Sequence, residues 1–190
     1  MDYTVKQLEA LYSAEDVHSG NISELPESYD VEFKNVTFAY KDRDVLKNVS
    51  FKAEQGKKTA LVGESGSGKS TAARLTVHYW DVSDGSITIG GRDIREYTFD
   101  TLMSMTAYVA QDNFLFRGTI ADNLRMGKND ATMDEMIAAA KLLPATTLFQ
   151  NFLMAMILKL ACSEESFPEA KRQRITIARA ILKNAPMNNS

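Results

Sequence analysis

The feature that most constrains this chain is one short glycine-rich segment. It fits the pattern G-x-x-x-x-G-K-[ST] at every fixed position and consists of Gly63, Glu64, Ser65, Gly66, Ser67, Gly68, Lys69 and Ser70. Glycines there let the backbone curl so that successive N–H groups point inward, and the following helix adds its positive N-terminal end. The segment therefore predicts a polyphosphate-binding loop between a buried strand, Thr59–Val62, and a helix, Ser70–Trp80.

Two side chains of this loop have expected roles. In loops of this kind the lysine, here Lys69, contacts the β- and γ-phosphates, and the hydroxyl that follows it, here Ser70, contacts a Mg²⁺ ion. The alternative is a glycine-rich turn before a helix that binds nothing. All four fixed positions match, and this favours the phosphate loop.

The bulk composition is that of an ordinary soluble domain. The 190 residues are 44% hydrophobic and 25% charged, with a net charge of −3 and a pI near 5.5. This balance argues against nucleic acid as the main partner and leaves open only a local basic patch at Lys171–Arg174. The single cysteine, Cys162, has no partner for an internal disulfide, which predicts a reducing compartment.

Neither a targeting segment nor a membrane span is predicted. The N-terminus lacks a positively charged region followed by an apolar core, as a signal peptide requires. The most apolar stretch, Phe152–Cys162, is interrupted by Lys159 and is far shorter than the ~20 residues that span a bilayer. His18 and His78 have no ligand partners at metal spacing, so we expect structural roles for both.

The chain divides into a polar tail and one α/β domain. In residues 1–30 the sequence predicts a short amphipathic helix at Val5–Leu11 and a linker at Asn21–Ser28, and this segment is expected to follow another domain. The rest, 31–190, begins with strands and continues with helices, which predicts an α/β fold with an antiparallel annex. The strands expected besides Thr59–Val62 are Val31–Tyr40, Val45–Phe51, Ser86–Ile89 and Met105–Ala110, and the later helices are Thr119–Leu124, Met133–Leu142 and Arg172–Leu182.

Several segments resemble the nucleotide-binding domain of ABC transporters. Val36–Tyr40 is similar to the family's A-loop and Tyr108–Asp112 to its Q-loop. Leu115–Ile120 is similar to the sequence that follows the Q-loop in exporters. ABC-type ATPases that act on DNA share the phosphate loop, but the last stretch favours exporters in which a permease precedes the ATPase. The resemblance covers Val31 to about Gln150 and Lys171–Pro186, and implies a P-loop ATPase fold with a helical subdomain at about 115–170.

The resemblance also implies the ligands and partners. Tyr40 is expected to stack on adenine, although a plain packing role is the alternative, and Gln111 is expected to complete the Mg²⁺ shell with Ser70. Implied partners are a transmembrane permease and a second nucleotide-binding domain, on the cytoplasmic side of the membrane and without nucleic acid. The residues expected to bind MgATP are Tyr40, Gly63, Glu64, Ser65, Gly66, Ser67, Gly68, Lys69, Ser70, Thr71 and Gln111.

The chain departs from the family at three places. Phe167–Arg172 stands where the signature LSGGxxQR should begin, and Leu153–Ala161 stands in place of PDGYDTxxG. The chain ends at Ser190, where an aliphatic strand ending in Asp-Glu is expected. We therefore assign no catalytic residue, and expect a core that is incomplete at its C-terminal end and a marginally stable, aggregation-prone chain.

One hypothesis accounts for all three departures. Leu153–Ala161 can be encoded by CTG ATG GCT ATG ATA CTG AAA TTG GC. If a C precedes this DNA and the reading frame begins at that C, the codons become CCT GAT GGC TAT GAT ACT GAA ATT GGC. These codons encode PDGYDTEIG. Similar shifts restore Ser-Gly-Gly at Phe167–Ala170 and Met-Ile-Ile at Met187–Ser190. The sequence thus predicts a frameshifted ABC exporter ATP-binding fragment. The alternatives are a non-hydrolysing nucleotide-binding module and a fragment with no function as translated.

Overall fold

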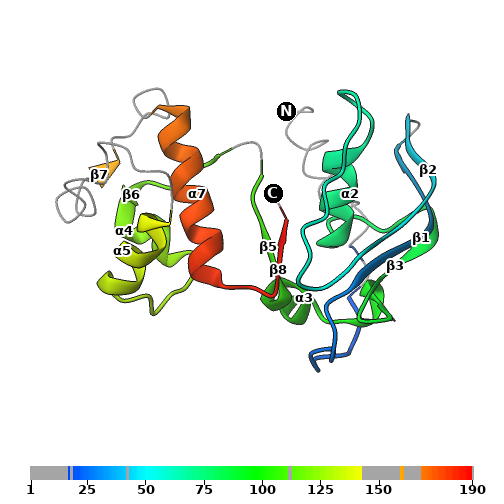
Figure 1. Cartoon of the computed structure of the whole chain (residues 1–190), viewed down its shortest axis with the longest axis horizontal. Helices are drawn as coiled ribbons and strands as arrows, with labels where there is room; N and C mark the ends of the chain where they lie inside the picture. The colour runs from blue at the N-terminus through cyan, green and yellow to red at the C-terminus, as the bar shows by residue number, and fades with distance from the viewer. Residues whose placement is uncertain are drawn as a thin grey trace, which may run out of the picture. The chain divides into compact units, whose positions relative to one another are not determined.

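The computed structural model describes residues 17, 19–41, 43–110, 113–142, 159–160 and 168–189. Contacts divide the chain into two units, Met1–Leu102 and Met103–Ser190. Figure 1 labels helices and strands of both units. The boundary predicted at residue 30 and the helical subdomain predicted at about 115–170 remain predictions.

The first unit is organised by a four-stranded antiparallel sheet. Strand β1 (Val31–Tyr40) pairs with β2 (Arg43–Ala53) and with β3 (Asp84–Ile89), and β4 (Arg92–Asp93) adds to β3. The order β2-β1-β3-β4 confirms the antiparallel annex expected from the strand-first pattern. Apolar side chains of β1 and β3 are buried in this sheet, among them Phe33, Val36, Phe38, Ile87 and Ile89.

Helix α2 (Lys69–Thr76) begins at the phosphate loop as predicted but ends four residues early. His78 takes a left-handed conformation with φ 57°. Its N–H donates to Leu75 O at 3.0 Å, and the N–H of Tyr79 donates to Arg74 O at 3.2 Å. This pair of hydrogen bonds is the Schellman arrangement that closes a helix, so the prediction that the helix continues to Trp80 was wrong.

The predicted strand Thr59–Val62 was also wrong. These four residues have no regular structure and are all exposed, Val62 at 92%. Periodicity identified an apolar run, but a strand also needs a hydrogen-bonded neighbour. Within the part of the chain that the structure describes, no strand pairs with this segment.

The N-terminal segment 19–30 packs on the rest of the first unit. Gly20 N donates to Tyr97 O at 3.0 Å and Ile22 N to Glu96 O at 3.0 Å, and the Lys52 ammonium lies 2.8 Å from the Asp30 carboxylate. The segment is therefore attached along its length before β1 begins. The predicted helix at Val5–Leu11 lies outside the described residues. Among the residues described, no helix is long and apolar enough to cross a membrane.

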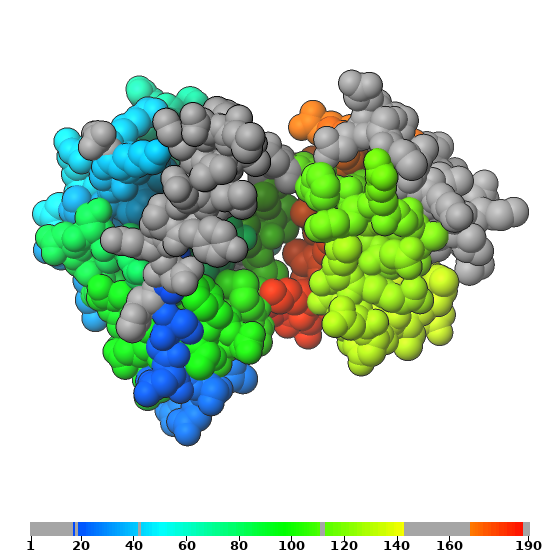
Figure 2. Space-filling model, turned by 180° about the vertical axis from the view of Figure 1, so that it is seen from behind, coloured from blue at the N-terminus to red at the C-terminus, as the bar shows by residue number. Residues whose placement is uncertain are grey.

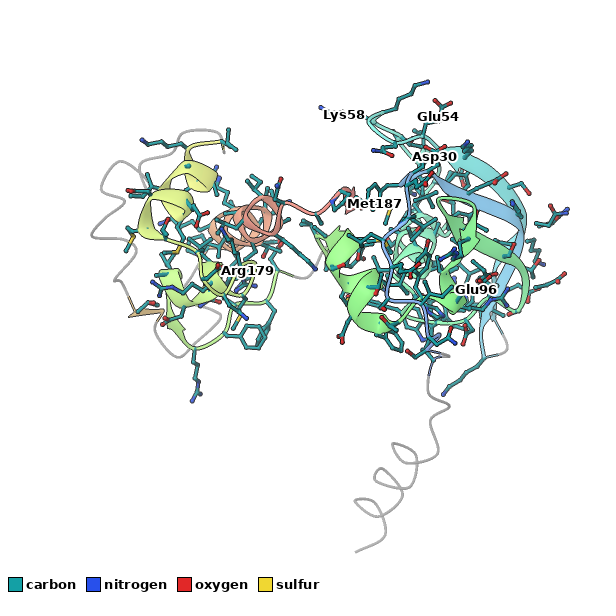
Figure 3. All side chains as sticks on the ribbon, turned by 90° about the horizontal axis from the view of Figure 1, so that it is seen from below. Asp30, Glu54, Lys58, Glu96, Arg179 and Met187 are labelled. Carbon is teal, nitrogen blue, oxygen red and sulfur yellow. The ribbon has the colours of Figure 1, made fainter. Side chains whose placement is uncertain are left out.

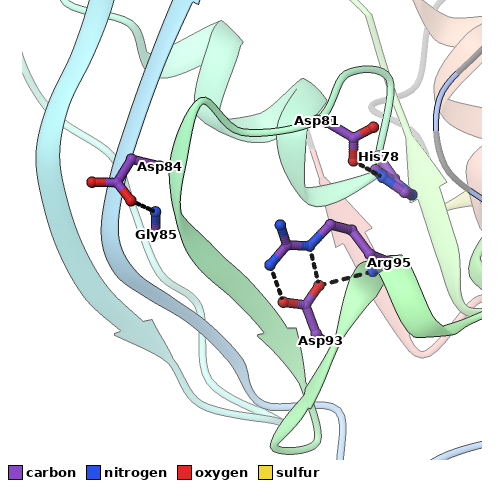
Figure 4. Close-up of polar contacts among 6 residues, drawn as sticks. All are labelled: His78, Asp81, Asp84, Gly85, Asp93 and Arg95. Atoms are coloured by element: carbon purple, nitrogen blue, oxygen red, sulfur yellow. Dashed lines mark hydrogen bonds and ion pairs between the residues drawn. The ribbon is translucent and has the colours of Figure 1, made fainter.

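Figure 4 shows carboxylates that stabilise turns of this unit, among them those of Asp81 and Asp93. Asp93 accepts from Arg95 N at 2.9 Å, Nε at 2.9 Å and Nη2 at 2.6 Å at the start of the short helix η1 (Ile94–Glu96). Burial of Asp93 raises the pKa of its carboxyl, but the hydrogen bonds from Arg95 outweigh burial and leave that pKa below the ordinary value. His78, which is buried, contacts Asp81 at 2.9 Å through Nε2, a contact that fits its predicted structural role.

In the described residues of the second unit, three helices pack together and two small sheets form. The helices are α4 (Ile120–Arg125), α5 (Met133–Lys141) and α7 (Glu169–Lys183), close to the three predicted. Thr119 and Thr132 each form a capping box that starts a helix. Figure 2 shows the residues of α4 and α5 packed as one group, in yellow-green. The shared core contains Ile120, Leu124, Met136, Ala139, Ile175, Ala178 and Leu182.

The strands of this unit are short. Strand β5 (Thr106–Tyr108) follows helix α3 (Phe99–Met105) and pairs in parallel with β8 (Met187–Asn189). Strand β6 (Gly118–Thr119) pairs antiparallel with β7 (Lys159–Leu160). The predicted strand at Met105–Ala110 is thus confirmed in its central residues. Helix α3 was not predicted.

Candidate functional site

The candidate site begins where the glycine-rich loop meets helix α2. Gly68 is the N-cap residue, with φ 89° and ψ 7°, a conformation that side chains with a Cβ rarely adopt. A Cβ there would lie 2.6 Å from Leu46 Cδ2 and 3.2 Å from Val45 O. The loop therefore packs against β2 at a point where only glycine fits.

Lys69 is folded back over this loop. Its ammonium donates to the carbonyl oxygens of Gly63 at 2.9 Å and Glu64 at 2.6 Å, and to Ser67 Oγ at 3.2 Å. All of the loop before Gly68 is exposed, so a ligand reaches this charge from solvent. The positive charge of the Lys69 side chain therefore lies at the centre of the loop.

The start of α2 adds further donors. Its N-cap has no side chain and makes no side-chain capping hydrogen bond, which leaves N–H groups of the first turn for another acceptor. Such a helix start favours anions, and the Ser70 hydroxyl is exposed beside it. The ammonium, the helix N–H groups and the hydroxyls are all hydrogen-bond donors, and a polyphosphate offers many acceptor oxygens. The residues at this site therefore fit the expected ligand chemically.

Tyr40 is brought to the same helix from the end of β1. Its hydroxyl lies 3.4 Å from Thr71 Oγ1, and its ring is half-buried. The structure thus places Tyr40 beside Thr71 at the start of α2, and the binding of one nucleotide by these residues and the loop stays a prediction. Gln111 lies outside the described residues, so its contribution to a Mg²⁺ site stays a prediction.

Two sets of residues were missed by the sequence analysis. Trp80 contacts Tyr40 from the turn after α2, forty positions further along the chain. In the second unit Arg179 reaches Asn123 and Phe114 across more than fifty positions of sequence. No local pattern in the chain indicates that contact.

Comparison with known proteins now identifies the family. The ABC transporter family model matches residues 46–188, a range that contains the whole glycine-rich loop. This chain belongs to the ABC transporter family. Members of the family bind ATP, generally with Mg²⁺. The resemblance seen in the sequence is therefore confirmed, as is the P-loop fold.

The curated relatives are a transporter, a putative export protein and a flippase. The chain is 42% identical over 164 residues to the mitochondrial iron-sulfur clusters transporter ATM1 of Saccharomyces cerevisiae, covering 85% of this chain and 24% of that protein. It is 42% identical over 159 residues to the putative multidrug export ATP-binding/permease protein YgaD of Bacillus subtilis, covering 83% of this chain and 27% of that protein. It is also 39% identical over 165 residues to the ATP-dependent lipid A-core flippase of Haemophilus influenzae, covering 85% and 28%.

A solved structure agrees with these relatives. A bacterial Atm1-family ABC exporter with ATP bound matches with a TM-score of 0.86 and 30% identity, covering 97% of this chain and 33% of that one. The ABC transporter domain described here thus spans about a quarter of the length of the curated relatives.

Proposed function

We propose that this chain binds MgATP as the ATP-binding part of an ABC exporter. The observation that carries the proposal is the Lys69 ammonium, held by Gly63 O and Glu64 O at the uncapped start of α2. A triphosphate that replaces these carbonyl oxygens around the ammonium also gains the N–H groups of the helix start.

The other candidate residues contact different parts of MgATP. Tyr40 stacks on the adenine, while the loop from Gly63 to Thr71 surrounds the phosphates. Ser70 and Gln111 are the residues that would hold Mg²⁺, and the ion, when bound, neutralises charge on the β- and γ-phosphates. Half-burial of Tyr40 beside Thr71 supports this division, because the base site then lies next to the phosphate site.

We propose that, in a full-length exporter that contains this ATP-binding domain, ATP binding drives transport through a permease. The ATP-binding domain would lie on the cytoplasmic side of the membrane and form a dimer with a second copy. Support comes from the exporter relatives, of which this chain spans about a quarter. The transported substrate is not assigned.

The function is tested by measuring binding and turnover on the same chain. Calorimetric titration with MgATP is expected to give saturable binding. A phosphate-release assay is expected to give no sustained turnover, because we assign no residue of this chain to activating water. Turnover at the rate of an exporter would contradict that assignment. Absence of binding in a folded chain would favour the alternative, a fragment with no function as translated.

We also propose that two internal segments are frameshifted, Leu153–Ala161 and Phe167–Ala170. Support comes from PDGYDTEIG, which codons compatible with Leu153–Ala161 encode after a shift by one base and which matches all seven fixed positions of PDGYDTxxG. Sequencing the coding DNA across both segments is expected to find codons that permit PDGYDTEIG and Ser-Gly-Gly in the neighbouring frame. Codons that encode neither of these two sequences in any reading frame would contradict the frameshift proposal.

A further inference from the structure

The chain's one tryptophan, Trp80, belongs to an aromatic cluster beside the phosphate loop. The rings of Tyr40 and Trp80 have centroids 5.0 Å apart and are nearly perpendicular, at 88°. Phe38 contacts Tyr40 at 4.8 Å, also at 88°, and lies 6.2 Å from Trp80. We call Phe38, Tyr40 and Trp80 the aromatic cluster.

Tyr40 is held at three points within this arrangement. Phe38, which is 4% exposed, contacts it along β1, Trp80 contacts it from the turn after α2, and Thr71 contacts its hydroxyl from α2 itself. Edge-to-face pairs of this kind favour a particular ring orientation. The ring of Tyr40 is therefore oriented by three separate segments before any ligand binds.

The direction of Trp80 is itself fixed. It follows the paired hydrogen bonds of His78 and Tyr79 that end α2, and His78 beneath the turn is 1% exposed. Trp80 remains 36% exposed, so its ring is not simply buried in the core. A rigid turn thus presents an aromatic side chain to Tyr40 at the surface.

We propose that Trp80 is a positioning residue for the nucleotide base, acting through Tyr40. This rests on the proposed function, in which Tyr40 stacks on the base. A flat base parallel to the Tyr40 ring is perpendicular to the Trp80 ring, so it does not stack on both. Trp80 therefore contributes by holding Tyr40 in its stacking orientation, which raises affinity for the base and leaves the phosphate contacts of the loop unchanged.

The test separates base binding from phosphate binding. Calorimetry on the full chain measures affinity for MgATP and for magnesium tripolyphosphate, which lacks a base. Trp80→Ala is expected to weaken MgATP binding by about fivefold, the effect of losing one aromatic pair, and to leave tripolyphosphate binding within about twofold. Trp80→Phe, which keeps an aromatic edge, is expected to restore most of the loss.

A second readout uses Trp80 in the wild-type chain. Because it is the only tryptophan, its emission reports the aromatic cluster directly. MgATP is expected to change this emission and tripolyphosphate is not, and Tyr40→Ala is expected to remove the response. This measurement holds even where Trp80→Ala fails to fold.

Three results would overturn the proposal. Equal affinity of Trp80→Ala and wild type for MgATP would show that Tyr40 needs no support. An equal loss for MgATP and tripolyphosphate in a folded variant would indicate a general structural role. A wild-type chain that binds neither ligand would overturn the proposed function and this inference with it, whereas the first two results leave the proposed function intact.

Discussion

Replacing Lys69 by alanine should weaken MgATP binding by about 100-fold or more. The ammonium contacts two carbonyl oxygens and a hydroxyl of the loop at 2.6 to 3.2 Å, so it lies where the phosphates would bind. Hydrogen bonds to a charged group are worth about 1.5–3 kcal/mol each, and two lost phosphate contacts correspond to about this loss of affinity. Calorimetric titration of the folded variant measures it.

The matched control is Lys57→Ala. Lys57 is a second lysine of the first unit, with its side chain 69% exposed and paired with Glu54 at 2.6 Å. An exposed pair of this kind contributes little to stability, and Lys57 has no assigned contact with the nucleotide. The control should bind MgATP like the wild type. Equal affinities for the Lys69 and Lys57 variants would contradict the assignment of Lys69.

Replacing Asn123 by alanine should lower the free energy of unfolding of the second unit by about 3 kcal/mol. Asn123 is fully buried. Its Nδ2 donates to Phe116 O at 2.9 Å and Thr119 O at 3.0 Å, while its Oδ1 accepts from Phe116 N at 2.9 Å and from Arg179 Nη2. Removing the side chain leaves several of these groups without a partner, at about 1–3 kcal/mol each when buried.

Arg179 makes this loss larger. It extends from α7 toward the segment that follows position 113 (Figure 3), where Nε donates to Asn123 O at 2.8 Å and Nη1 to Phe114 O at 3.0 Å. Burial lowers the pKa of Arg179, because a partly desolvated cation is less favourable. A partly buried cation that loses a hydrogen-bond acceptor is destabilising, so Asn123 and Arg179 act together.

Urea denaturation followed by far-UV circular dichroism measures the effect, because the longest helix described, α7, lies in this unit. Asn129→Ala is the control, since Asn129 is an exposed asparagine of the same unit. It should change the unfolding free energy by no more than about 0.5 kcal/mol. If the two asparagine variants were equally stable, the network around Asn123 would not stabilise this unit.

Features governed by local pattern were predictable from the sequence. The apolar pattern of Val31–Tyr40 predicted a strand, and the helical stretches Thr119–Leu124 and Met133–Leu142 are close to the observed α4 and α5. The glycine-rich loop located the candidate site, because glycine and lysine at fixed spacing have few other uses.

Features that depend on distant partners were not predictable. Thr59–Val62 has a strand-like composition, but it is exposed and no strand among the described residues pairs with it. The end of α2 depends on a left-handed His78, a conformation that composition does not signal. The contact between Trp80 and Tyr40 joins residues forty positions apart, and only the fold brings them together.

The most direct test of the central claim is a calorimetric titration of the 190-residue chain with MgATP, repeated with Lys69→Ala. The account predicts saturable binding of about one nucleotide per chain, as one loop provides, and its near-complete loss in the variant. A folded wild-type chain that binds no MgATP would contradict it.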